Sequence, residues 1–187
     1  EGKYKIETYH NGQLGAEIDT IEGCQMGTID IAVVNQSTIG NFINDFQALD
    51  IPYLITSTEQ ADAVFLGDIG TRFLDKLSGV QLYGLGIWES GFRNLTNSKR
   101  DVNSVDDVAG LKIRTMENSY HLAFWKAIGA NPTPMSFSEV YIGLQQHTID
   151  AQENPYEVIV SNTLYEQQDY VVETNHLPHL ISLIVND

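Results

Sequence analysis

The order of apolar and polar residues at the start of the chain changes between the period of a strand and the period of a helix. Residues 3–9 predict a strand, residues 16–26 predict a helix that Gly27 ends, and residues 28–34 predict a second strand. Together these elements predict an opening βαβ unit.

The same alternation of element types continues along the rest of the chain. A capping box at Ser57 and Gln60 predicts a long helix through Leu77, and residues 80–87 predict a strand after it.

Two more helices are predicted further on, at residues 119–128, before a glycine, and at residues 156–168. Alternating strands and helices are typical of an α/β fold, and we expect its sheets to be largely parallel. No internal repeat is evident in the sequence.

Residues 110–115 read GLKIRT and predict a short strand with Leu111 and Ile113 on one face and Lys112 and Arg114 on the other. A guanidinium held at a strand end can bind a carboxylate through two parallel hydrogen bonds, so Arg114 is a candidate ligand for an organic acid. The alternative is a structural or surface arginine that pairs with one of the chain's many acidic residues.

A helix is predicted to begin at Phe137, because Ser136 and Glu139 form a capping box. The positive end of that helix favours an anion, and the Phe137 ring can line its pocket, although a place in the core is the alternative. Residues 150–155 read DAQENP and predict a polar loop in which the final proline holds Asn154 extended. The amide of Asn154 suits a hydroxyl or a carboxylate.

Charge excludes one class of partner and favours another. The 187 residues carry a net charge of -15, which argues against nucleic acid, because phosphate binding needs a basic surface. No stretch is long and apolar enough to predict a transmembrane helix. Half of the ten Lys and Arg residues nevertheless lie in one short window, which suits an anionic small molecule. They are Arg93, Lys99, Arg100, Lys112 and Arg114.

Enzymatic and metal sites have weak support. Cys24 is the only cysteine, so the chain cannot form an internal disulfide, a zinc knuckle or a redox pair. Asp150 and Glu153 are available for acid–base chemistry, but no nucleophile elbow, P-loop or dinucleotide fingerprint is present. His176 and His179 are the best metal candidates, yet without a third ligand they read as a loop. We therefore expect no metal, no cofactor and no catalysis.

Ordered motifs run along the whole chain. They are YHNGQLGAE from Tyr9, GTIDIAVV from Gly27, IPYL from Ile51, GFRNLTNSKR from Gly91, GLKIRT, GANPTPMSFSEVY, and DAQENP followed by YEQQDY and TNH. This series resembles the solute-binding proteins of tripartite ATP-independent periplasmic (TRAP) transporters, of the DctP type. The resemblance implies that Arg114 binds a ligand carboxylate, that Arg93 is a second cation facing the ligand, and that Phe137 and Asn154 contact it.

The resemblance also implies a two-lobe periplasmic-binding-protein-like fold. Residues 1–90 would form part of lobe I, residues 91–178 would form lobe II with both arginines, and residues 179–187 would return to lobe I. Compared with the family, the chain lacks the first strand and helix and the C-terminal part, so it reads as a fragment. Lobe I would contribute Asn35 and Gln36, with Ser37 beside them, from the end of a strand, although an ordinary turn is the alternative.

The function that the resemblance implies is capture of a small organic acid, a C4-dicarboxylate or a sugar acid such as a uronate, in a cleft between closing lobes. The ligand would then be delivered to the membrane subunits of a TRAP transporter for import. We expect a monomer in the periplasm, or one anchored outside the membrane in a Gram-positive source. The alternatives are a ligand-sensing ectodomain of a signalling protein with the same cleft and, with less support, an acid–base enzyme.

Overall fold

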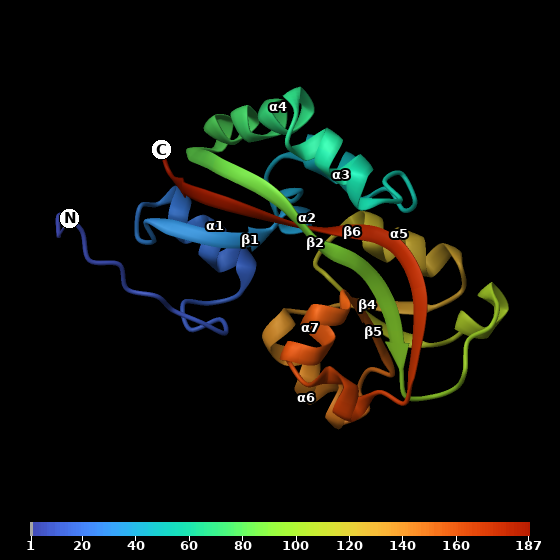
Figure 1. The fold of residues 1–187 in the computed structure, drawn as a ribbon. Helices are drawn as coiled ribbons and strands as arrows, with labels where there is room; N and C mark the ends of the chain where they lie inside the picture. Colours follow the sequence, from blue (N-terminus) through green and yellow to red (C-terminus); the bar gives the residue numbers. More distant parts are fainter. Residues whose placement is uncertain (1) are drawn as a thin grey trace.

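The computed structural model describes residues 2–187, which form a six-stranded sheet with helices packed against it (Figure 1). In order across the sheet, the strands are β1 (Ile31–Asn35), β6 (Tyr170–Asn186), β2 (Leu82–Asn97), β5 (Ala151–Asn154), β3 (Lys112–Thr115) and β4 (Asn131–Pro134). The α-helices are α1 (Glu17–Gln25), α2 (Gln36–Ile39), α3 (Thr58–Phe65), α4 (Asp68–Lys76), α5 (Ser119–Ala127), α6 (Phe137–Gln145) and α7 (Tyr156–Ser161). Short 3-10 helices are η1 (Asn44–Asp50), η2 (Leu77–Val80), η3 (Val105–Val108) and η4 (Leu164–Gln167).

The predicted α/β class is confirmed, but the expectation of largely parallel sheets is wrong. β1 pairs with β6, β6 with β2, and β2 with β5 in antiparallel ladders, and only β3 pairs in parallel, with β4 and β5. Strands that are joined through a covering helix run parallel, as β3, β4 and β5 do through α5 and α6. β6 instead returns along β2 in the opposite direction, which makes the sheet mixed.

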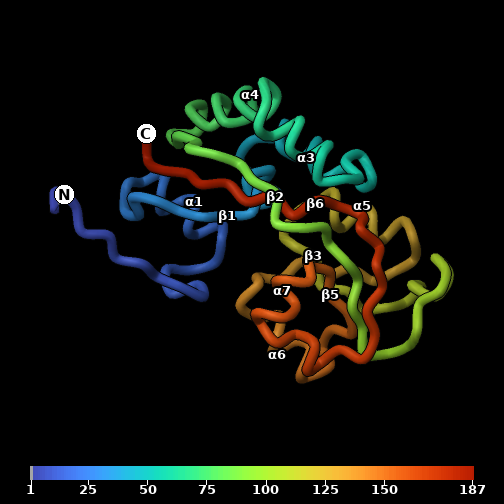
Figure 2. The backbone as a smooth tube through the Cα atoms, viewed as in Figure 1, coloured from blue at the N-terminus to red at the C-terminus, as the bar shows by residue number. Residues whose placement is uncertain are grey.

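β2 and β6 are the longest strands, with 16 and 17 residues, and they run side by side from the β1 end of the sheet to β5 (Figure 2). The predicted strand at residues 80–87 was therefore too short. The predicted loop around His176 and His179 is also wrong, because both residues lie within β6.

The full length of these strands was not predicted, because they contain glycines and a proline, and both residue types normally mark turns. In the structure they lie where the β2–β6 ladder shifts register, between Gly84 and Gly86 and next to the pair that Phe92 forms with Pro178. β-bulges tolerate such residues, so the strands continue through them.

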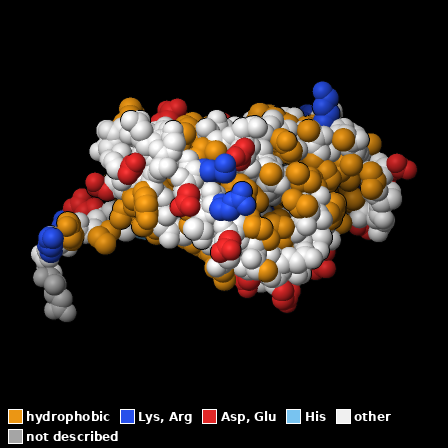
Figure 3. All heavy atoms as spheres, turned by 90° about the horizontal axis from the view of Figure 1, so that it is seen from above, with side chains coloured by type: hydrophobic (Ala, Val, Ile, Leu, Met, Phe, Trp, Pro, Cys, Tyr) orange, Lys and Arg blue, Asp and Glu red, His pale blue; other side chains and the backbone are white. Residues whose placement is uncertain are grey.

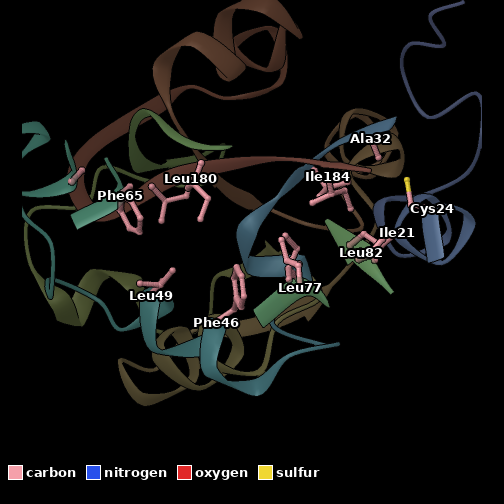
Figure 4. Close-up of a cluster of buried hydrophobic side chains, with 14 of the residues drawn as sticks. Ile21, Cys24, Ala32, Phe46, Leu49, Phe65, Leu77, Leu82, Leu180 and Ile184 are labelled. Atoms are coloured by element: carbon pink, nitrogen blue, oxygen red, sulfur yellow. The ribbon is translucent and has the colours of Figure 1, made fainter. Parts of the chain in front are cut away.

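Apolar side chains form three separate clusters. The first, shown in Figure 4, packs helices from the first half of the chain, including Cys24 and Phe46, against the sheet at Ile184. The second packs Trp125 of α5 against Leu95 of β2, and the third joins α6 to α7 and η4. Cys24, near the end of α1, is buried in this first cluster.

Three further predicted elements differ from the structure. Residues 3–9 are exposed coil rather than a strand, and they extend away from the body of the molecule (Figure 3), where no strand lies alongside to supply ladder hydrogen bonds. The predicted helix through Leu77 is interrupted at Gly67, between α3 and α4. The predicted helix at residues 156–168 is interrupted at Thr163, whose φ of 53° is not helical. No helix in the described part of the chain is long and apolar enough to cross a membrane.

Candidate carboxylate-binding site

Arg114 lies in β3 and is 97% buried, with an exposed fraction of 3%. Its Nε and Nη2 atoms both donate hydrogen bonds to the carbonyl oxygen of Met135, at 2.9 and 2.6 Å. These two bonds fix the plane of the guanidinium. The edge formed by Nη1 and the remaining Nη2 hydrogen donates to no acceptor among residues 2–187, and such an edge binds a carboxylate bidentately.

The charge of Arg114 has no partner in the described chain, because none of the ion pairs found among residues 2–187 includes it. Burial, followed by the nearby positive charge of Arg93, lowers the pKa of Arg114 to about 10, so the guanidinium remains protonated at neutral pH. A buried charge without a partner is costly, and an anionic ligand would compensate it.

Phe137 lies beside Arg114, with its ring centroid 5.8 Å from the guanidinium carbon. α6 begins at this residue, as predicted, but Ser136 caps nothing, because its hydroxyl bonds to the hydroxyl of Ser138 instead. The Phe137 side chain is 38% exposed, so it is not part of the core. The ring and the positive end of α6 therefore both border the guanidinium.

Asn154 lies in β5, so the predicted loop at residues 150–155 is wrong, although the extended backbone before the proline is confirmed. β5 pairs with both β2 and β3, which explains why four polar or small residues form a buried strand. The Asn154 amide nitrogen donates to Gln152 at 2.6 Å, and the Gln152 amide donates to Thr96 at 2.7 Å. These bonds orient the Asn154 side chain and leave its amide oxygen, Oδ1, without a donor among the described residues.

The two arginines predicted to bind the ligand lie on opposite faces of the sheet, because side chains alternate along β5. The register of Ile113 with Ala151 places Arg114 on the same face of the sheet as Gln152 and Asn154. Glu153 lies on the other face, and Arg93 is bonded to it there.

Arg93 is fully buried and is held mainly by Glu153. Its Nε donates to Glu153 Oε2 at 2.5 Å, and its Nη2 donates to Glu153 Oε1 at 2.9 Å and to the Glu153 carbonyl at 2.6 Å. Its Nη1 is 2.7 Å from Nδ1 of His179. Burial disfavours the ionised carboxyl group, but Arg93 holds the pKa of Glu153 well below its usual value. Of the five guanidinium hydrogens only one remains for a ligand, so the predicted contact of Arg93 stays a prediction.

The two histidines singled out as metal candidates have separate partners. His176 Nε2 lies 3.0 Å from Glu153 Oε2, and the His176 ring stacks on Phe124 with centroids 5.5 Å apart. Burial, followed by the positive charge of Arg93, lowers the pKa of His179 to about 3, so His179 is neutral and accepts the hydrogen bond from Arg93.

A second group of buried polar residues was not identified from the sequence. Asp50 accepts hydrogen bonds from Ser37 at 2.5 Å and Asn118 at 2.8 Å, and it lies 3.2 Å from His121. His121 Nδ1 is 3.7 Å from Glu153. Burial alone would lower the pKa of His121, but its hydrogen bonds with the two carboxylates raise it. Only Asn118 had a local signal, because asparagine is a favoured N-cap and it caps α5.

The predicted residues at the end of β1 separate in the structure. The Gln36 amide is buried and donates to the Phe46 carbonyl at 2.7 Å. Asn35 instead bonds to Glu17, whose carboxylate accepts from its backbone nitrogen at 3.0 Å and from its amide at 2.8 Å. Glu17, which the sequence analysis did not single out, is one of the carboxylates that raise the pKa of Arg114 against the effect of burial.

The chain is similar to known proteins in both sequence and fold. The family model described as "Bacterial extracellular solute-binding protein, family 7" matches residues 1–187. A solute-binding protein from Verminephrobacter eiseniae is 42% identical over 176 residues, which are 94% of this chain and 52% of that protein. The chain thus spans about half the length of the curated relatives it matches.

Two solved structures are similar in both fold and sequence. One is a TRAP periplasmic solute-binding protein from a Polaromonas species bound to D-erythronate, with a TM-score of 0.96, 40% identity, and coverage of 98% of this chain and 61% of that one. The other is a sugar acid binding protein from Advenella mimigardefordensis in complex with galactonate, with a TM-score of 0.96, 37% identity, and coverage of 99% and 60%.

Proposed function

This chain belongs to family 7 of the bacterial extracellular solute-binding proteins, and we propose that it forms much of the ligand site of a TRAP transporter's solute-binding protein. The ligand is a small organic acid, either a sugar acid or a C4-dicarboxylate, and the protein binds it without chemical change. Relatives whose solved structures hold erythronate and galactonate support this class of ligand.

The observation that carries this proposal is the state of Arg114. Its guanidinium is buried, oriented by Met135 and without a carboxylate partner in the described chain. Structural arginines in a protein interior are compensated, as Arg93 is by Glu153. An arginine that is held rigid but left uncompensated is preorganised for an anion that comes from outside.

Around this anchor we propose three further ligand contacts. Asn154 offers its carbonyl oxygen, Phe137 packs against the ligand, and Asn35 approaches from the β1 side of the cleft. Gln36 supports the site indirectly, because its hydrogen bond to the Phe46 carbonyl holds the residues that follow β1 in place.

We also propose that the site closes by a hinge. Residues 1–90 with 179–187 form one lobe and residues 91–178 the other, and the separate apolar clusters on either side support this division. β2 and β6 are the two long strands that reach both sets of clusters, so bending along them would move the lobes as units.

The remaining parts of the proposal concern the whole protein. It acts outside the cytoplasmic membrane, as the family's description implies, and works as a monomer. After closure on the ligand, it delivers the acid to the membrane subunits of the transporter. Such a role needs no metal or cofactor.

The test is binding of organic acids to the full-length gene product that contains residues 1–187. A thermal-shift screen against sugar acids, dicarboxylates and neutral sugars should show stabilisation by acids alone, because a ligand that binds only the folded state raises Tm. Arg114→Ala should then cost about 2–5 kcal/mol of binding free energy in calorimetry. Arg114→Lys should recover only part of it, since lysine lacks the planar fork.

The matched control is Arg72→Ala, an exposed arginine on α4 that should leave affinity unchanged. Equal affinity for acids in the unaltered protein and Arg114→Ala would refute the proposed role of Arg114.

A further inference from the structure

We infer that this site selects a hydroxylated monocarboxylate over a dicarboxylate, and that Glu17 is the residue that rejects a second carboxylate. The inference rests on the function proposed above and narrows its ligand class. It is carried by the positions of the charged groups around Arg114 and by the hydrogen bonds that Glu17 makes.

The first step identifies which buried charged groups already have partners. Asp50 and Glu153 lie on either side of His121, at 3.2 and 3.7 Å, and Glu153 also binds Arg93. Both carboxylates therefore already have hydrogen-bond partners within the chain. Arg114 is the buried arginine without an ion-pair partner among the described residues, so it is the group that takes the ligand carboxylate.

The second step places Glu17 near that cation. Glu17 holds the residues that follow β1 through Asn35 and through the hydroxyl of Thr38, which donates to it at 2.7 Å. The same segment packs on the residues that follow β3, where the Asn118 amide donates to the Ser37 carbonyl at 2.9 Å. The two strand ends therefore meet, and the Glu17 carboxylate lies close enough to Arg114 to raise the pKa of its guanidinium against the effect of burial.

A second ligand carboxylate would approach Glu17. Like charges that face one another across a site sheltered from water repel strongly, and this repulsion is a common way of rejecting a wrong ligand. Arg93 cannot relieve it, because Glu153 already takes three of its hydrogen bonds. The first half of the chain thus contributes a carboxylate at the place where a dicarboxylate needs a cation.

Glu17 is instead suited to a hydroxyl. A carboxylate offers about four lone-pair sites, and three of those on Glu17 already accept hydrogen bonds, which leaves one for a ligand O–H. The carbonyl oxygen of Asn154 is a second acceptor on the other side of the site. The Phe137 ring, exposed beside the guanidinium, can pack on the C–H groups of a hydroxylated carbon chain.

The test compares pairs of acids that differ only at one end. D-erythronate and meso-tartrate share the same carbon chain and hydroxyl configuration, as do D-gluconate and D-glucarate, but the second acid of each pair carries another carboxylate in place of a hydroxymethyl group. Calorimetry on the full-length gene product should show the monocarboxylate of at least one pair binding about tenfold or more tightly than its dicarboxylate. Succinate, which lacks hydroxyls, should bind no better than tartrate.

The variant Glu17→Gln removes the negative charge and keeps the size and an acceptor oxygen, so it should reduce the preference to about threefold or less. Glu17→Asp keeps the charge and should keep a preference for the monocarboxylate. The matched control is Glu22→Gln, an exposed acid on the same helix, which should leave the preference unchanged.

Each outcome bears on a different statement. Dicarboxylates that bind as tightly as their partners in the unaltered protein would overturn this inference and leave the proposed function in place. A preference for the monocarboxylate that persists in Glu17→Gln would show that Glu17 is not the residue that rejects the second carboxylate. If none of these acids binds, the proposed function itself is contradicted, and this inference with it.

Discussion

Arg93 and Glu153 form a buried ion pair on the face of the sheet opposite Arg114, with Arg93 Nε 2.5 Å from Glu153 Oε2. Glu153 follows Gln152 directly in β5, so one strand contributes an uncharged polar residue to one face and a carboxylate to the other. This alternation allows two arginines to have different roles in a small volume: one is compensated by the protein, and one is left for a ligand.

Glu153→Ala should destabilise the fold, because it leaves the Arg93 guanidinium buried without a charged partner. Removing one partner of a buried ion pair costs about 3–5 kcal/mol, and this loss should appear in the free energy of unfolding by urea. The exposed Glu22 is the control, since Glu22→Ala should change that free energy by about 0.5 kcal/mol or less. A loss for Glu153→Ala that is no larger than for Glu22→Ala would contradict the importance of the pair.

Acid should destabilise the protein partly through His179. Its pKa in the folded protein is about 3, and in the unfolded chain it is about 6.5, so between these values the unfolded state binds one more proton. Stability contributed by neutral His179 is thus present above about pH 6.5 and is lost as pH falls towards 3.

His179→Gln keeps an acceptor for Arg93 but does not titrate, so its stability should fall less steeply between about pH 6 and 4, by up to about 1.4 kcal/mol per pH unit. Urea unfolding at several pH values measures this slope. His10→Gln is the control, because His10 is exposed and should not change the slope. Parallel slopes for the unaltered protein and His179→Gln would show that His179 titrates normally.

Asn118 should contribute more to stability than an ordinary helix cap. Its carbonyl oxygen accepts from Tyr120 and His121, and its amide donates to Ser37 and Asp50. Losing a cap costs about 1 kcal/mol, and each lost buried hydrogen bond adds about 1 kcal/mol, so Asn118→Ala should cost about 2–4 kcal/mol.

The comparison for Asn118 is Ser57→Ala, which removes the exposed cap of α3 and should cost only about 1 kcal/mol in the same unfolding experiment. Equal losses in the two variants would mean that the contacts of Asn118 with Ser37 and Asp50 add nothing.

Local patterns in the sequence were sufficient to predict the elements around Arg114, the proposed anchor for the ligand. The GLKIRT alternation located β3 and directed Arg114 to its side of the sheet, and the Ser136 and Glu139 pattern located the start of α6 at Phe137, although the Ser136 side chain makes no capping bond there. These signals are short-range, because strand alternation and helix starts depend on neighbouring residues. The extended backbone of Asn154 followed in the same way from the proline after it.

Contacts between residues far apart in the chain could not be predicted from such local patterns. The pairing of β2 with β6 joins residues far apart in the chain, and the glycines and the proline at its bulges resemble turn signals. The partner of Arg93 is Glu153, 60 residues away, and no local pattern indicates which acid compensates a given arginine. Glu17 was missed for this reason too, since its contacts with Asn35 and Thr38 arise only in the folded chain.

Asn154→Ala should weaken ligand binding less than Arg114→Ala does. The Asn154 amide nitrogen is already bonded to Gln152, so its contribution to a ligand is mainly one neutral hydrogen bond through its carbonyl oxygen. Such a bond contributes about 0.5–1.5 kcal/mol, whereas the guanidinium makes two charge-assisted bonds of about 1.5–3 kcal/mol each. Calorimetry of both variants with the same acid gives the two losses directly. Gln152→Ala is the informative companion, because it frees the Asn154 amide to rotate and should weaken binding without removing a proposed contact. If Asn154→Ala costs more than Arg114→Ala, then Asn154 rather than Arg114 is the principal anchor, and the uncompensated charge of Arg114 must be neutralised by something other than the ligand.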